Sequence, residues 1–165
     1  MTSLSPLLDA GPAIQLHVAG AVTALLLGPV ALYRKRRDRL HKILGYTWIL
    51  AMTLTAISSF WIHSLRLIGP FGPIHLLSIW ALISLAQGLS AAIRGQIARH
   101  QATMRSLYLY AIGAAGIFTL LPGRIVPRML FGDDSQMGLW LIAGLVALGL
   151  AGMARGRLRK SPRNA

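Results

Sequence analysis

Hydrophobic and polar positions divide the chain into five long apolar segments separated by short polar stretches. A helix rises 1.5 Å per residue and the hydrocarbon core of a bilayer is ~30 Å thick, so about 20 apolar residues cross it. Each segment is long enough, or nearly so, to be a transmembrane helix. The predicted helices cover residues 11–33, 43–65, 74–93, 103–121 and 137–154.

Composition agrees with this pattern. Of the 165 residues, 55% are hydrophobic and 13% are charged, and the mean hydropathy of +0.59 is too high for a soluble domain of this length. We therefore predict an all-α integral membrane protein with about five transmembrane helices. Four would form a core bundle and one would follow at the C-terminus, within a single membrane domain that spans residues 1–165.

Basic residues indicate the orientation of the helices. The chain has 17 Lys and Arg against 4 acidic residues, for a net charge of +13. They cluster at residues 34–42, at residues 94–105 and in the tail at residues 155–165, so that alternating helices place 14 of the 17 on one side. By the positive-inside rule, the N-terminus faces outward and the tail faces the cytoplasm of a bacterial inner membrane.

The same distribution bears on partners. Nucleic-acid binding requires basic residues on one water-facing surface, interleaved with aromatic residues, which this chain does not offer. Anionic lipid is the expected partner of basic clusters at the ends of apolar segments. We therefore predict lipid contact and no nucleic-acid contact; the oligomeric state is left open.

Several kinds of chemistry are excluded by missing side chains. The sequence has no cysteine, which rules out disulfides, iron–sulfur clusters and covalently attached haem. It has no glutamate, and no aspartate falls within a predicted span, so paired carboxylates for acid–base catalysis are absent there. No catalytic residue is assigned, and whether the protein is an enzyme is left open.

Histidines are the remaining candidates for chemistry. His17 and His75 stand near the starts of the first and third helices, whereas His41 and His100 stand at the starts of the second and fourth. Because neighbouring helices run in opposite directions, the first two share the outer membrane level and the other two share the inner level. Two facing neutral imidazoles are the axial ligands of a low-spin b-type haem.

Small residues accompany the histidines. Gly20 and Ala24 lie on the helical face of His17, and Gly45 follows His41 by four residues. They would leave room for a porphyrin, although close packing of helices alone also explains them. Interfacial preference likewise explains any one histidine taken alone. We assign His63 as an interfacial residue, a residue near the haem or an alternative outer ligand.

Four stretches resemble a known family. His41–Gly45, Ser59–Ser78, Arg99–Arg105 and Phe118–Arg124 are similar to the bacterial predicted membrane proteins grouped as domain of unknown function 2306, DUF2306. The resemblance covers roughly residues 16–132. It implies a membrane protein and supplies no function.

A fainter, positional similarity is to the di-haem transmembrane cytochromes b of the cytochrome b561 type. Their four-helix core also carries one histidine near the start of each helix. By position, this similarity implies His17 with His75 and His41 with His100 as the haem ligands. The chain lacks an obvious lysine-rich site for ascorbate on the outer face, so the electron donor is not implied.

The leading hypothesis is a membrane electron carrier or oxidoreductase with two b-type haems and quinone as a redox partner. Arginines near the membrane faces could contact haem propionates or an anionic substrate; the candidates are Arg66, Arg124 and Arg128 outside and Arg99 and Arg105 inside. Two alternatives stay open. One is a cofactor-free structural or accessory membrane protein, and the other is a transition-metal transporter using His17, His63 and His75.

Overall fold

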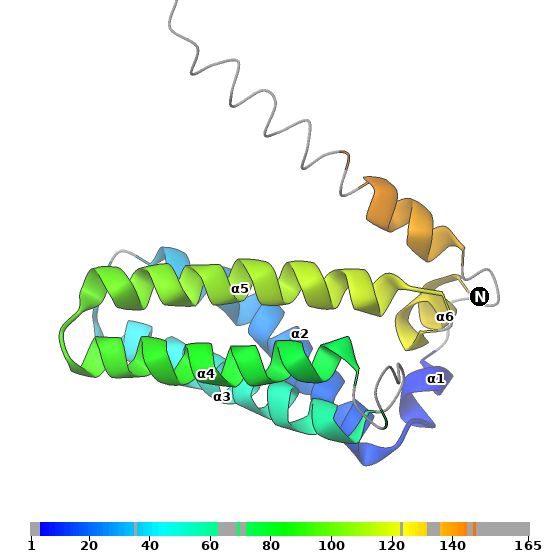
Figure 1. Cartoon of the computed structure of the whole chain (residues 1–165), viewed down its shortest axis with the longest axis horizontal. Helices are drawn as coiled ribbons and strands as arrows, with labels where there is room; N and C mark the ends of the chain where they lie inside the picture. Colours follow the sequence, from blue (N-terminus) through cyan, green and yellow to red (C-terminus); the bar gives the residue numbers. More distant parts are fainter. Residues whose placement is uncertain are drawn as a thin grey trace, which may run out of the picture. The chain divides into compact units, whose positions relative to one another are not determined.

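The computed structural model describes residues 4–34, 36–62, 69, 72–122, 124–131, 136–144 and 147, and these are helical apart from short connections. The helices are α1 (Ser5–Leu8), α2 (Pro12–Tyr33), α3 (Arg39–Ser58), the 3-10 helix η1 (Ser59–Trp61), α4 (Pro73–Ile93), α5 (Ile97–Leu120) and α6 (Ile125–Phe131) (Figure 1). Residues 137–144 are also helical, and no strand occurs among the described residues.

The all-α membrane fold predicted from the sequence is confirmed. Within the described residues, α2, α3 with η1, and α4 are long and apolar enough to cross a membrane, and α5 with α6 makes a fourth span if the two form one broken helix. The predicted fifth helix is described only over residues 137–144; its remainder and the basic tail lie outside the described residues.

Two helices begin earlier than the hydrophobic pattern predicts. α3 begins at Arg39 rather than at residue 43, and α5 begins at Ile97 rather than at residue 103. Apolar patterning locates the part of a helix that lies in hydrocarbon, whereas the hydrogen-bonded helix continues into the polar interface. α6 was not predicted; its Pro127 occupies the first turn, where a missing N–H breaks no helical hydrogen bond.

The chain divides into two compact units, residues 7–115 and residues 1–6 with 116–165. In the first unit, α2 packs on α3, α3 packs on α4, and η1 contacts both α2 and α4. The first part of α5 completes the bundle: the Tyr108 hydroxyl donates to the Leu25 carbonyl of α2 at 3.1 Å, and Met104 packs where a β-carbon on Gly88 of α4 would lie. Four helices therefore surround one core, with α3 and α5 facing each other across it.

Many small side chains lie in this core beside a few large ones such as Trp48 and Leu107, and most of the large apolar side chains point outward. Ala24, Ala51 and Ala81 are buried, whereas Leu26 is 67% exposed and Leu76 is 72% exposed. A soluble protein of this size rarely exposes so much apolar surface, but bundles in lipid bring small residues together and turn large ones to the acyl chains. Side-chain distribution thus supports the membrane assignment independently of hydropathy.

The small-residue stripe of α2 serves helix packing. A β-carbon on Gly20 would lie 2.6 Å from Thr55 Oγ1 and 3.0 Å from the Ala51 carbonyl oxygen, so α2 and α3 touch there through their backbones. One turn further along, the Trp48 indole donates to the Ala24 carbonyl at 3.1 Å. Of the two explanations for the small residues, room for a porphyrin or close packing of helices, the structure shows close packing at Gly20.

The second unit is described only in part. Within it, a β-carbon on Gly138 would lie 2.2 Å from the Leu120 carbonyl oxygen and 3.3 Å from Pro127. Gly138 thus permits close contact between the 137–144 helix and the end of α5. The prediction of one membrane domain over the whole chain stays a prediction.

Candidate functional site

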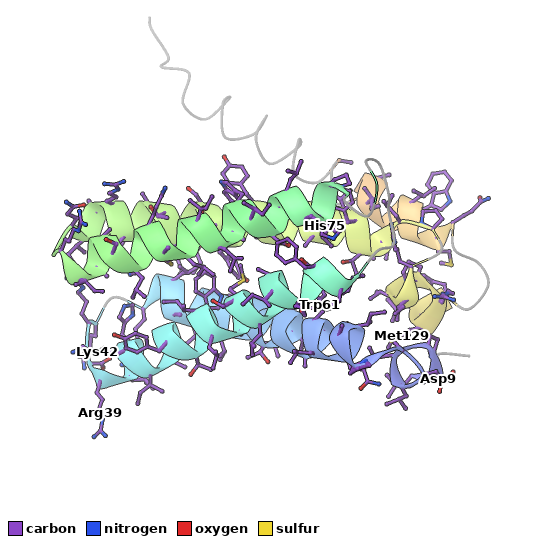
Figure 2. All side chains as sticks on the ribbon, turned by 60° about the horizontal axis from the view of Figure 1, so that its bottom comes forward. Asp9, Arg39, Lys42, Trp61, His75 and Met129 are labelled. Atoms are coloured by element: carbon purple, nitrogen blue, oxygen red, sulfur yellow. The ribbon has the colours of Figure 1, made fainter. Side chains whose placement is uncertain are left out.

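Basic side chains gather at one end of the first unit, where α2 connects to α3 and α4 turns into α5. We call this the basic end. Figure 2 shows Arg39 and Lys42 there, and Trp61 and His75 at the opposite end of the same unit. His41 and His100, at the starts of α3 and α5, both lie at the basic end.

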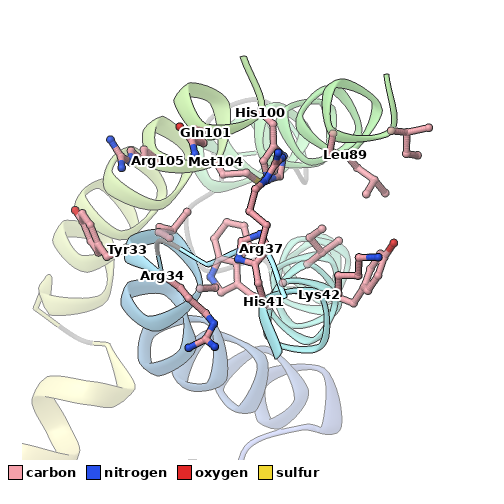
Figure 3. A pocket seen from close by; sticks show the side chains of 18 residues that line it. Tyr33, Arg34, Arg37, His41, Lys42, Leu89, His100, Gln101, Met104 and Arg105 are labelled. Carbon is pink, nitrogen blue, oxygen red and sulfur yellow. The ribbon is translucent and has the colours of Figure 1, made fainter. Parts of the chain in front are cut away.

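A cavity of about 640 Å³ opens at the basic end, with lining residues from α2, α3, α4 and α5. His41 and His100 both line it, and Figure 3 shows them coming from opposite sides of it. We call it the histidine cavity. Its volume falls in the range of roughly 300–1,000 Å³ that is usual for small-molecule and cofactor sites.

His41 is held by the cap of its own helix. The Asp38 carboxylate accepts the His41 backbone N–H at 3.0 Å, as an N-cap does. The same carboxylate accepts two hydrogen bonds from Arg34, one of them from Nε at 3.0 Å and the other from the guanidinium Nη2. The bonds from Arg34 and from the His41 N–H lower the pKa of Asp38 to about 2. Asp38 therefore ties the end of α2 to the turn that carries His41.

His100 carries the hydrogen bond typical of a metal-ligating histidine. Its Nδ1 lies 2.9 Å from the Gly88 carbonyl oxygen of α4. A carbonyl can only accept, so Nδ1 holds the proton and the neutral ring keeps its lone pair on Nε2. Ligating histidines commonly donate their other ring N–H to a backbone carbonyl in this way.

The wall beside His41 leaves open space. Gly45 lines the cavity one turn after His41, and a β-carbon built on it would meet no atom within 4 Å. The wall is completed by apolar side chains, among them Leu32, Trp48, Ile49, Leu89 and Met104. An apolar wall beside two imidazoles suits a flat, largely apolar ligand, which is how a porphyrin presents itself.

Cations surround the same cavity. Arg37, Lys42 and Arg105 line it, and the Arg105 guanidinium lies 5.7 Å from the centre of the Tyr33 ring. In the described part of the chain, Asp38 with Arg34 is the one acid–base pair within ion-pair distance, so these three cations have no carboxylate partner there. The histidine cavity thus offers positive charge to an anionic group of a ligand.

At the opposite end of the first unit, His17 and His75 make different hydrogen bonds from each other. His17 Nδ1 lies 2.8 Å from the Thr55 carbonyl oxygen, so that His17, like His100, carries its proton on Nδ1. His75 is buried, and its Nδ1 accepts the Gly72 backbone N–H at 3.0 Å. Neutral His75 therefore has its proton on Nε2, which is the reverse of a histidine ready to ligate iron through Nε2.

Serines fill the core between these two histidines' helices. The Ser59 and Ser78 hydroxyls lie 2.6 Å apart, which joins η1 to α4, and Ser58 Oγ lies 3.4 Å from His17 Nδ1. Such bonds are common between membrane helices. Neither His17 nor His75 lines the histidine cavity.

The remaining sequence-predicted residues fall in several places. Arg105 lines the histidine cavity, whereas Arg99 lines a second hollow at the α4–α5 turn. Arg124 directly precedes helix α6 of the second unit, and Arg128 lies within that helix. His63 and Arg66 lie outside the described residues.

Three features of the site were not predicted from the sequence: the Asp38 cap, the Arg37 side chain and the Tyr33–Arg105 contact. Asp38 carried a usable signal, because an aspartate directly before Arg39-Leu40-His41 is a common N-cap. Arg37 was indistinguishable from its basic neighbours. The Tyr33–Arg105 contact joins residues 72 positions apart, which no local pattern reveals.

The metal-transport hypothesis stays a prediction. No group of three or more His, Cys, Asp or Glu side chains that could hold a metal ion occurs among the described residues. His63, one of the three ligands it needs, lies outside them.

Comparison with known proteins identifies a family for this chain but no similar curated protein and no similar solved structure. The positional similarity to di-haem cytochromes b therefore stays a prediction. The family profile described as predicted membrane protein (DUF2306) matches residues 14–154, which include α2 from its third residue, all of α3 to α6 and all four paired histidines. The chain therefore belongs to the DUF2306 family of predicted membrane proteins.

Proposed function

We propose that the chain is a membrane electron carrier or oxidoreductase that holds a b-type haem in the histidine cavity, between His41 and His100. The observation that carries this proposal is that two histidines, from helices facing each other across the bundle, line one cavity of about 640 Å³. A bound b-type haem would supply reversible one-electron transfer.

The residues present fit such a group. His100 has its Nε2 lone pair available because Nδ1 donates to Gly88. His41 lines the same cavity and Gly45 leaves space beside it; unlike His100, its buried Nδ1 has no hydrogen-bond partner among the described residues, so no bond at Nδ1 fixes its tautomer. Arg37, Lys42 and Arg105 would bind the two propionates, which need cations when they approach an apolar site.

The proposal includes a second haem between His17 and His75, for which fewer observations speak than for the haem between His41 and His100. What supports it is their common placement near the starts of α2 and α4 and the Nδ1 donor bond of His17. His75 would have to give up the cap bond from Gly72 for its proton to move to Nδ1 and free Nε2. Quinone as the redox partner is likewise a proposal, resting on the membrane location of the site.

Absorption spectra of the detergent-purified protein, recorded before and after dithionite, test the proposal. Cells should be supplied with ample haem. We expect a low-spin b-type spectrum, and we expect His41→Ala and His100→Ala each to abolish the component that belongs to the histidine cavity, because loss of one axial ligand destroys a low-spin centre. His63→Ala should leave it unchanged.

The grouping of variants decides between one haem and two. If a second centre exists, His17→Ala and His75→Ala remove a separate component and spare the first. If only His41→Ala and His100→Ala matter, the protein carries one haem. A wild-type protein that stays colourless refutes the haem proposal and favours the cofactor-free accessory protein.

A further inference from the structure

A second hollow lies at the α4–α5 turn. It has a volume of about 290 Å³ and is lined by Gln87 and Ser90 of α4, by Arg94 and Gln96 of the turn, and by Arg99 of α5. Gly95 has a φ of +72°, a conformation that favours glycine, and it allows the turn to be short. Arg94 and Arg99 therefore both line one small hollow at this turn.

The hollow is rich in hydrogen-bond donors and positive charge. Two guanidiniums, two amides and one hydroxyl line it. Neither arginine has a carboxylate within ion-pair distance in the described part of the chain. An anion with several acceptor oxygens, such as a phosphodiester, would match this set of donors.

The position of this hollow relative to the membrane favours a lipid over a soluble anion as its ligand. α4 is a candidate membrane span that ends at Ile93, so Arg94 stands directly at its end, where phospholipid headgroups lie. Gln87, seven residues earlier, lies about 10 Å of helix further toward the membrane interior. Buried Ala91 also lines the hollow. The hollow therefore extends from headgroup depth toward the acyl chains.

We propose that this hollow binds one anionic phospholipid from the leaflet at the basic end, with its phosphodiester between Arg94 and Arg99. A lipid with net negative charge fits better than a zwitterionic one, because the headgroup cation of the latter would face two guanidiniums. None of the five polar residues lines the histidine cavity, so the site does not depend on the proposed haem.

Native mass spectrometry of the purified full chain tests the site. The protein is titrated with phosphatidylglycerol, with phosphatidylcholine and with inorganic phosphate, and the tightest binding event is followed. A basic residue near an anionic lipid contributes roughly fivefold in affinity. We therefore expect Arg94→Gln or Arg99→Gln to weaken the tightest phosphatidylglycerol event about fivefold, and the double variant about 30-fold.

Arg39→Gln is the matched control, because it removes the same charge from the basic end and Arg39 lines neither cavity. It should change the affinity much less than Arg94→Gln does. All three arginines are exposed, so the variants are expected to fold, which size-exclusion chromatography checks.

Three results would overturn the site. Equal weakening by Arg39→Gln would show attraction to surface charge in general. Phosphatidylcholine binding as tightly as phosphatidylglycerol would remove the charge argument. Inorganic phosphate occupying the site as tightly as the lipid would identify a soluble anion as the ligand. A colourless protein that still shows the expected lipid pattern would refute the haem proposal and leave the lipid site standing.

Discussion

At the scale of single residues, Asp38 joins two functions in one carboxylate. It caps α3 through the His41 N–H and pairs with Arg34 at the end of α2. It is also an exposed side chain, so water and salt screen both interactions. Its effect is therefore expected in the local order of the turn that carries His41 rather than in a large global stabilisation.

The lowered pKa of Asp38 makes a prediction about pH. The ordinary value is 3.8 and the value in the folded chain is about 2, so Asp38 stabilises the folded state fully above pH 3.8 and progressively less as the pH falls toward 2. Thermal unfolding of wild type and Asp38→Asn should differ at about pH 5 and converge as the pH falls below 2, where Asp38 becomes neutral in the folded chain as well.

Two variants separate the cap from the ion pair. Asparagine is as good an N-cap as aspartate, so Asp38→Asn removes mainly the Arg34 pair, whereas Asp38→Ala removes both. We expect Asp38→Ala to melt at a lower temperature than Asp38→Asn at every pH. Equal melting of the two variants would contradict the cap.

Gly45 offers a variant that tests the histidine cavity without disturbing packing. Nothing lies within 4 Å of a β-carbon at this position, so Gly45→Leu would place its side chain into open space beside His41. We expect normal yield and a normal elution profile together with loss of most of the haem absorbance. Gly45→Ala should retain much more of it, and equal retention by both variants would count against a ligand beside Gly45.

The level at which each histidine lies followed from the sequence, because helix direction alone assigns histidines at alternate helix starts to alternate ends. Which ring nitrogen of each histidine carries the proton could not be predicted from the sequence. Whether Nδ1 donates, as in His100, or accepts, as in His75, depends on whether a carbonyl or an N–H faces it. The Gly88 carbonyl that faces His100 comes from a neighbouring helix, and no pattern around His100 encodes it.

At the scale of helices, close approach of α2 and α3 predicts an asymmetry between two substitutions. Gly20→Leu would force a side chain into Thr55 and the Ala51 carbonyl, where overpacking costs ~1–3 kcal/mol. Leu26, which is 67% exposed, faces away from the core, so Leu26→Ile should be mild. Thermal unfolding in detergent measures both.

The haem absorbance of Gly20→Leu separates an effect on helix packing from an effect on the histidine cavity. Gly20 packs on α3 and does not line the histidine cavity, so a folded fraction of Gly20→Leu should keep the absorbance of the His41–His100 centre per mole of protein. Equal melting temperatures for Gly20→Leu and Leu26→Ile would show that α2 and α3 do not approach closely in the membrane.

Hydrophobic patterning predicted the existence and type of the helices well, and their polar ends less well. α2 and α4 agree with the predicted segments to within one residue at each end, because both begin at a proline and end where apolar residues give way to arginine. α3 and α5 begin four and six residues early, since their first turns are polar and rely on a cap or on the preceding turn.

At the scale of the whole molecule, charge predicts how the chain lies in the membrane. Reporters fused at Ser3 or Asp133 should report the outside, and those at Arg36, Gln96 or Ser161 the cytoplasm, because 14 of 17 basic residues fall on one predicted side. A cytoplasmic signal from the N-terminal reporter would contradict this orientation. It would move the histidine cavity to the outer face without changing its residues.

The histidine cavity also has a consequence for biogenesis. Its lining comes from α2, α3, α4 and α5, and His100 and Arg105 belong to the last of these to be synthesised. A ligand that needs all these walls can bind only after the fourth helix has joined the other three in the bilayer. Once bound, it would stabilise the association of the four helices, so the first unit of a ligand-free chain is expected to unfold more readily than that of a ligand-bound chain.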